Sequence, residues 1–201
     1  MHSHLSGMES SRRDRLRAPP KEILMKNTTI CVLALGCTLL GTAAVHAQSS
    51  TQDADKTFLT TASQSDFTEI KFSQLAQEKA TNPRVKAYAQ KMITDHNQLE
   101  ADMKPYAEKW GLTPPTALDS DHQSKYDALS AMSGADFDKQ YMMDMDADHH
   151  TSLDLFKQEQ SSTTDTAFKQ KVNKGEKVVA QHTMMADKAV KMMGGTPAAG
   201  M

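Results

Sequence analysis

Apolar residues recur every three or four positions in four stretches of this chain, and each apolar series is interrupted by an acid or a histidine. The series are Phe58, Ala62, Ser65, Glu69, Phe72 and Ala76; Val85, Ala89, Met92, His96, Leu99, Met103, Tyr106 and Trp110; Met142, Met145, His149, Leu153 and Phe156; and Phe168, Val172, Gly175, Val179, His182, Ala186, Ala189 and Met193. This spacing is typical of helices that pack on other helices. Because a buried ionisable group is costly unless it is paired or bound, the four series predict a polar centre shared by a helical bundle.

Turn-forming residues separate the expected helices. The expected ranges are 57–80, 83–110, a short helix at 119–132, then 133–160, and a last helix from the polar turn at 161–165 to Met193. Asn82-Pro83 marks a tight turn, and Pro105 is expected to kink or break the second helix. The irregular stretch 111–116 is long enough to cross the bundle, and no stretch shows the alternation of a strand. We therefore expect an all-α antiparallel four-helix bundle with one long crossover that contains a short extra helix.

The N-terminal part of the chain has the features of an export signal. Residues 25–47 combine a positive start, an apolar run and a small-residue cleavage pattern at Ala47, so we interpret them as a signal peptide. Residues 1–24 are interpreted as a mis-called N-terminal extension, 48–56 as a flexible lead-in, 57–193 as the bundle domain and 194–201 as a disordered tail. A periplasmic or secreted protein is expected, with no transmembrane segment after Ala47 because no later apolar run could span a bilayer.

Charge and cysteine content narrow the class of partner. Residues 48–201 retain 17 of the 23 Lys and Arg and 22 of the 25 Asp and Glu, a net charge of about −5, which argues against nucleic acid. Both cysteines, Cys31 and Cys37, lie in the expected signal, so no disulfide framework follows. The residues after Cys37 are apolar, which disfavours a lipoprotein anchor at that position. A homo-oligomer is left open.

The position of each polar residue along the bundle axis can be compared by counting residues from the nearest turn. With a rise of about 1.5 Å per residue, Glu69 and His96 lie at nearly the same distance from the turn at Asn82. On the second pair of long helices, His182 is expected about 10 Å away from the height of His149. A cluster of Glu69, His96 and His149 is therefore better supported than one that includes His182.

A metal ion is one occupant that such a cluster could take. The expected ligands are Glu69, His96 and His149, with His182 less favoured. Carboxylate and imidazole ligands suit iron, manganese or zinc. Asp95 and Asp148 each precede a histidine in a shared M-x-x-D-H sequence, and they are expected to accept a hydrogen bond from a ligand histidine on a neighbouring helix.

Two alternatives to that metal site stay open. The first is a buried hydrogen-bond network without an ion, which the sequence favours because the Glu-x-x-His motif of di-metal bundles is missing before His96 and altered before His149. The second is a copper site built from thioethers and histidines, because methionines cluster at 142–145 and on the last helix. Methionine also fills cores, which is the favoured interpretation of those positions.

Several segments resemble an exported bacterial domain-of-unknown-function family with a ferritin-like fold, often labelled "predicted outer membrane protein". The matching segments are 69–76, 82–89, 92–96, 133–138 and 147–149, together with His182 in the last helix. The resemblance implies a ferritin-like bundle without an established activity. The chain departs from the family pattern at Lys177 and Gln181, where the family often has a proline and a second histidine.

The sequence therefore ranks three functions. The first is an exported binding or stress-protective module whose buried His/carboxylate centre is structural. The second is a metal-binding protein with ferritin-like oxidase chemistry at its centre, and the third is a Met/His copper protein. No phosphate-binding loop, G-x-S-x-G or His-Glu-x-x-His motif is present, so an enzyme is not favoured.

Overall fold

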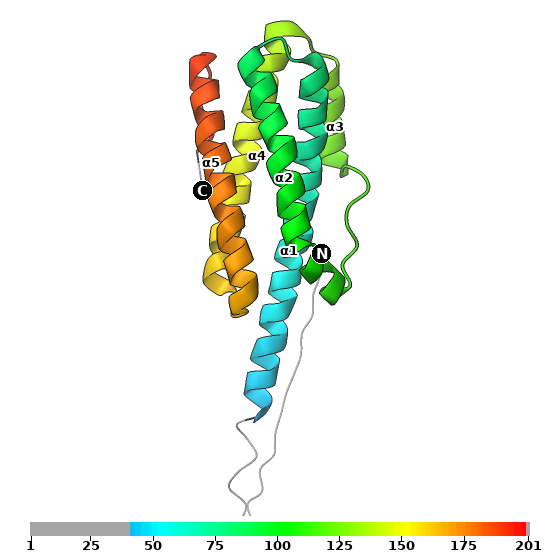
Figure 1. Ribbon diagram of the computed structural model, residues 1–201, viewed down its shortest axis with the longest axis vertical. Helices are drawn as coiled ribbons and strands as arrows, with labels where there is room; N and C mark the ends of the chain where they lie inside the picture. The colour runs from blue at the N-terminus through cyan, green and yellow to red at the C-terminus, as the bar shows by residue number, and fades with distance from the viewer. Residues whose placement is uncertain (1–40, 200–201) are drawn as a thin grey trace, which may run out of the picture. The chain divides into compact units, whose positions relative to one another are not determined.

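A computed structural model describes residues 41–199 of the chain, with side chains described from residue 51 onward. Five helices are present in this range: α1 (Gly41–Lys79), α2 (Pro83–Trp110), α3 (Ser120–Ser130), α4 (Gly134–Ser162) and α5 (Thr166–Met192). The described residues contain no strand. The expected all-α four-helix bundle with a crossover helix is confirmed, and the two long helical pairs can be followed in Figure 1.

Local sequence signals account for the helix ends. The Asn82 side chain accepts a hydrogen bond from the Arg84 N–H. Pro83 occupies the first turn of α2, where the backbone N–H that proline lacks would have no partner within the helix. Gly111 ends α2 in the left-handed conformation, with a φ of 69°. The Asp165 carboxylate accepts hydrogen bonds from the N–H groups of Ala167 and Phe168, and so caps the start of α5.

Three expected boundaries differ from the structure. The lead-in at 48–56 is part of α1, where Asp55 is buried and no proline or glycine interrupts residues 42–79. At Pro105, where a kink or a break was expected, α2 is not broken, and because Pro105 is exposed, water can satisfy the carbonyl that loses its partner. The tail expected to be disordered is placed as far as Ala199, and the Ala198 N–H donates to Asp146.

The signal-peptide interpretation falls mostly on residues outside the described range. Residues 1–24 and 25–40 are not described, and the expected cleavage point after Ala47 falls within α1. Cleavage there stays a prediction.

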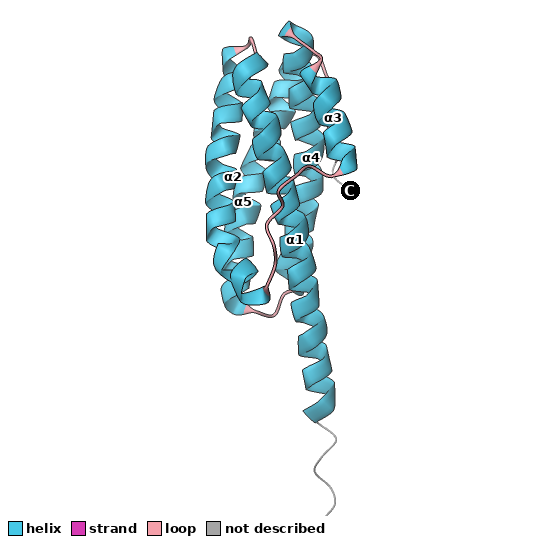
Figure 2. Cartoon of the chain, turned by 90° about the vertical axis from the view of Figure 1, so that its right-hand side faces the viewer, coloured by secondary structure: helices cyan, strands magenta, loops and turns pink. Residues whose placement is uncertain are grey.

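The crossover sets the directions of the helices. The α1–α2 and α4–α5 pairs are antiparallel hairpins, and the chain between α2 and α3 runs back along the bundle in Figure 2. The α1 helix packs on α2 and α4, and α5 packs on α4 and more thinly on α2. The Asp138 carboxylate on α4 accepts hydrogen bonds from the N–H groups of Thr81 and Asn82, at 3.0 and 2.9 Å, which ties the α1–α2 turn to the second hairpin.

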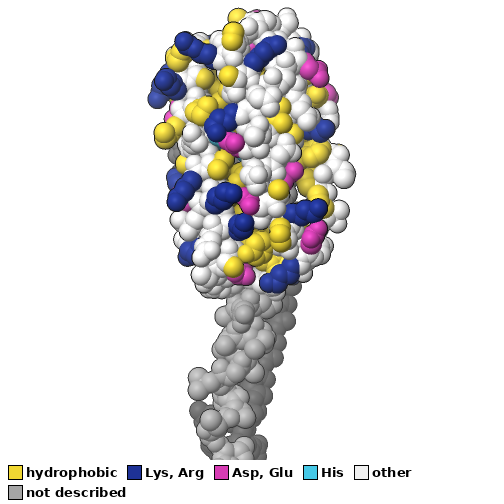
Figure 3. Space-filling view, viewed as in Figure 1, with side chains coloured by type: hydrophobic (Ala, Val, Ile, Leu, Met, Phe, Trp, Pro, Cys, Tyr) yellow, Lys and Arg dark blue, Asp and Glu magenta, His cyan; other side chains and the backbone are white. Residues whose placement is uncertain are grey.

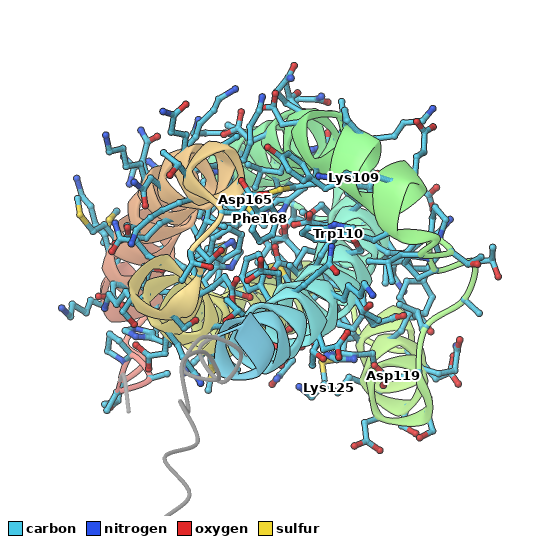
Figure 4. All side chains as sticks on the ribbon, turned by 90° about the horizontal axis from the view of Figure 1, so that it is seen from below. Lys109, Trp110, Asp119, Lys125, Asp165 and Phe168 are labelled. Atoms are coloured by element: carbon cyan, nitrogen blue, oxygen red, sulfur yellow. The ribbon has the colours of Figure 1, made fainter. Side chains whose placement is uncertain are left out.

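Two separate apolar clusters fill the bundle. One contains Phe72, Ala89, Met92, Tyr141, Met142 and Met145. The other contains Phe58, Leu59, Met103, Phe156, Phe168 and Val172. Viewed along the bundle in Figure 4, Trp110 and Phe168 lie near each other at one end, and their ring centroids are 4.9 Å apart. Met142 and Met145 are buried core residues, as the core-filling interpretation of methionine predicts.

Candidate metal centre

A layer of polar side chains crosses the bundle between the two apolar clusters. On each long helix of the bundle, the layer falls where one cluster ends and the other begins. Its members are Ser65, Asp66, Glu69, His96, His149, Ser152, His182 and Thr183, all buried except the half-buried Ser65. Each long helix therefore contributes polar groups to one shared interior site, as the interrupted apolar series predict.

His96 on α2 contacts two carboxylates of α1. Its Nδ1 lies 2.7 Å from Asp66 Oδ1, and because a carboxylate only accepts, Nδ1 carries the proton. Its Nε2 lies 2.7 Å from Glu69 Oε2, although the pair is not aligned as a hydrogen bond. The ring is thus fixed by Asp66, with its second nitrogen turned toward Glu69.

The other two histidines are held in the same way. His149 Nδ1 donates to the Met145 carbonyl oxygen, one helical turn earlier, at 2.7 Å. His182 Nε2 donates to Asp95 Oδ2 at 2.8 Å. Since a carbonyl or a carboxylate fixes the proton on one nitrogen, the remaining nitrogen of each neutral ring carries a lone pair.

Four inward-facing atoms of the layer have no hydrogen-bond partner among the described residues. They are Glu69 Oε2, His96 Nε2, His149 Nε2 and His182 Nδ1. The three imidazole centroids are 5.2–5.7 Å apart, and the three histidines each offer a ligand atom within 4.8 Å of the others. Glu69 Oε2 does make ion-pair contacts, at 2.7 Å with His96 Nε2 and at 3.5 Å with His149 Nε2. Buried polar atoms without an aligned hydrogen bond are uncommon, so four in one place need an explanation.

Burial and charge set the protonation of this centre. Burial lowers the pKa of His149, and it lowers the pKa of His182 to about 4, so both rings are neutral near pH 7. Burial also opposes the charging of His96, but the Glu69 carboxylate and the Asp66 hydrogen bond raise its pKa to about 10. Burial opposes ionisation of Glu69, but His149 and His96 lower its pKa to about 2. Without an ion, the centre holds a His96 imidazolium beside an ionised Glu69.

The position of His182 differs from the prediction. Its ring centroid lies 5.4 Å from that of His149, so it belongs to the layer and is not a turn or two away. Helical side chains lean toward the N-terminus of their own helix. His182 on α5 therefore leans toward the α4–α5 turn, and His149 on α4 leans away from it, which brings the two rings together.

Of the two acids expected to accept a hydrogen bond from a ligand histidine, Asp95 and Asp148, only Asp95 does so. Asp95 orients His182, as expected, but the carboxylate of Asp148 pairs with Lys125 of α3, at 3.5 Å, and not with a histidine of the layer. Asp66, which orients His96, was not predicted. It lies three residues before Glu69, so helical spacing could have placed it on the same face.

A family model describes what class of protein this is. The chain belongs to a family described as a domain of unknown function, DUF4142, whose model matches residues 40–189. A comparison with curated proteins gives no match. None of the described helices is long and apolar enough to cross a membrane, and nothing found supports the outer-membrane label.

Two solved structures share the fold. A DUF305 protein from Streptomyces coelicolor has a TM-score of 0.62 at 14% identity, over 73% of this chain and 96% of that one. A DUF305 fragment from Deinococcus radiodurans has a TM-score of 0.53 at 12% identity, over 70% and 93% of the two chains. These likenesses show the helical bundle and carry no statement about activity.

Proposed function

We propose that this protein is an exported metal-binding bundle that holds one divalent transition ion in its polar layer. The proposed ligands are His96 Nε2, His149 Nε2 and His182 Nδ1, together with Glu69 Oε2. The three histidines can bring one ligand atom each within 4.8 Å of the others, and Glu69 Oε2 lies 2.7 Å from His96 Nε2 and 3.5 Å from His149 Nε2. The observation that carries the proposal is that these buried nitrogen and oxygen atoms converge without an aligned hydrogen bond, while the outer nitrogen of each ring is held by an acceptor. That pairing of a free inner nitrogen with a bound outer one is the usual arrangement of ligating histidines.

The ligand set fits one ion better than two. A ferritin-type di-metal site uses a carboxylate from each of two helices and Glu-x-x-His from two more. Here the inner set has one carboxylate and three imidazoles, and the second carboxylate, Asp66, is engaged by the outer nitrogen of His96. Three imidazoles and a carboxylate suit zinc, iron or manganese, and a closed set of four fits zinc best.

Burial favours binding over catalysis at this centre. Glu69 and the three histidines are at most 1% exposed, whereas a catalytic metal site keeps a position open to water or substrate. A divalent cation would also balance the negative charge of the buried Asp66 and Glu69 carboxylates. Because the His96 proton must leave for its nitrogen to ligate, binding would release a proton.

Export rests on separate support. The signal-like residues 25–47 agree with it, and the similar protein from Streptomyces coelicolor is described as a candidate secreted protein. Detection of a mature N-terminus near Gln48 in an extracytoplasmic fraction tests this part, and an unprocessed cytoplasmic chain contradicts it.

The binding function is tested by metal analysis of protein purified without an affinity tag, followed by thermal unfolding of the metal-free form with added Zn²⁺. A free ion at one hundred times its Kd should stabilise the fold by about 2.7 kcal/mol. His149→Gln should remove most of this gain, whereas His122→Gln, which changes a histidine of α3 outside the layer, should retain it. If Zn²⁺, Fe²⁺ and Mn²⁺ all leave the melting temperature unchanged, the layer is a structural ion-pair network instead.

A further inference from the structure

A second group of ligand-type side chains joins α4 to α5 outside the polar layer. Asp146, His150 and Asp187 each bring one ligand atom within 4.8 Å of the others. Asp146 and His150 are four residues apart on one face of α4, and His150 Nε2 lies 2.9 Å from Asp187 Oδ1 on α5. The His150 side chain is only 17% exposed.

Asp146 is the member that a plain surface ion pair does not explain. It is 1% exposed, its Oδ2 accepts from the Ala198 N–H at 2.5 Å, and its Oδ1 has no hydrogen-bond partner among the described residues. The neighbouring acid is Asp187, which cannot donate when ionised. A buried oxygen beside a second carboxylate calls for a cation or a proton between them.

We propose that Asp146, His150 and Asp187 form a second divalent-metal site on the α4–α5 pair, suited to an oxygen-preferring ion such as Mn²⁺. Two carboxylates and one imidazole match that ion, whereas the central layer is richer in nitrogen. The side chains of His150 and Asp187 are 17% and 30% exposed, so water can complete the coordination. This site therefore exchanges its ion with solvent more readily than the closed central layer does.

The C-terminal tail takes part in this site. The Ala198 N–H holds the outer oxygen of Asp146, which leaves the other oxygen for the ion. An ion at Asp146, His150 and Asp187 would therefore connect α4, α5 and the tail. The proposal does not depend on the central layer, since none of its ligands is shared with it.

The test is titration of the metal-free full-length protein with Mn²⁺, with free Mn²⁺ measured by electron paramagnetic resonance. His149→Gln weakens the central layer, so it serves as the background in which the second site is observed alone. In that background we expect one Mn²⁺ per chain, lost in Asp187→Asn and retained in Asp144→Asn. Asp144 is a matched control because it lies on α4, bonded to Gln140, outside the group. If the Asp187→Asn variant binds Mn²⁺ as its His149→Gln parent does, the proposal is overturned.

A second measurement needs no substitution at the site. In an NMR spectrum of the folded His149→Gln variant, bound Mn²⁺ should broaden the Ala198 amide signal before that of Thr81, which lies at the α1–α2 turn. An Ala198 signal that stays sharp at saturating Mn²⁺ would show that Asp146 and Asp187 share only a proton. Failure of this site leaves Zn²⁺ stabilisation through His149 unaffected, so the two proposals fail separately.

Discussion

Replacing Asp95 and Asp148 by alanine, one at a time, tests whether a metal ligand is oriented by its acidic neighbour. Asp95 holds a proposed ligand, His182, whereas Asp148 stands at the same place in the repeated sequence but holds no ligand. Both acids precede a histidine in an M-x-x-D-H sequence. Asp95 accepts a hydrogen bond from His182 at 2.8 Å, whereas Asp148 lies 3.5 Å from Lys125, on the outer side of the bundle where Figure 4 labels that lysine. The pair is therefore a matched test of the proposed ligand geometry.

The expected effect of Asp95→Ala follows from freeing the His182 ring. Without its acceptor, His182 can rotate or change tautomer, so its inner nitrogen no longer points at the ion. Loss of such a support weakens metal affinity by about 10- to 100-fold, equivalent to about 1.4–2.7 kcal/mol. Asp148→Ala should leave affinity unchanged. It should cost little stability, because Asp148 Oδ1 pairs only with the exposed Lys125, at 3.5 Å, and Asp148 Oδ2 is buried without a hydrogen bond.

The assay is competition of each metal-free variant against a chromophoric Zn²⁺ chelator at fixed pH and ionic strength. Circular dichroism of each variant provides the folding control. Equal loss of affinity in both variants, or no loss in Asp95→Ala, would refute the assignment of His182 as a ligand oriented by Asp95.

Three further predictions concern stability. His96→Ala should lower the free energy of unfolding by about 1–3 kcal/mol, because it leaves two buried carboxylates without their partner; an unchanged denaturant midpoint would contradict the burial of His96. The metal-free protein should lose stability as pH falls from about 6.5 to about 4, by on the order of 3 kcal/mol, because His182 has a pKa of about 4 when folded and the unfolded chain binds the proton first; a flat urea midpoint over that range would argue against a neutral buried His182. Gly175→Ala should cost about 1–3 kcal/mol, because its Cβ would meet the Phe156 ring; a thermal midpoint equal to that of the wild type would show that the ring moves aside freely.

Helix positions could be predicted because they depend on local chemistry. The apolar spacing of α2 and its Pro83 and Gly111 ends define the observed range without reference to other helices. The start of α1 was missed, since a polar segment such as 48–56 joins a helix when its neighbours extend it and Asp55 is buried against the bundle. Such burial depends on tertiary packing.

The candidate site could be predicted only in part for a related reason. An apolar series shows which face of a helix is buried, and this was enough to bring Glu69, His96 and His149 together. It does not show how far side chains lean along the axis, so His182 was placed too far away. Nor does it show which acid a histidine meets across the bundle, and so Asp66 was missed and Asp148 was included.

The face of the molecule drawn in Figure 3 shows no concentrated patch of basic side chains. On the face drawn in Figure 3, Lys and Arg are spread among acidic and hydrophobic side chains rather than gathered into one basic patch. The sequence argument against a nucleic-acid partner stays a prediction based on a net charge of about −5. The unusual chemistry of the described residues lies in the buried layer, where four ligand-type atoms lack an aligned hydrogen bond.

The most direct measurement of the central claim is anomalous X-ray diffraction from crystals of the protein grown with Zn²⁺, recorded on both sides of the zinc absorption edge. We predict one peak within the polar layer, about 2.0–2.2 Å from Glu69 Oε2, His96 Nε2, His149 Nε2 and His182 Nδ1. A layer without a peak, in crystals where zinc is bound elsewhere or not at all, would contradict the claim and leave a structural network of His96, Asp66 and Glu69.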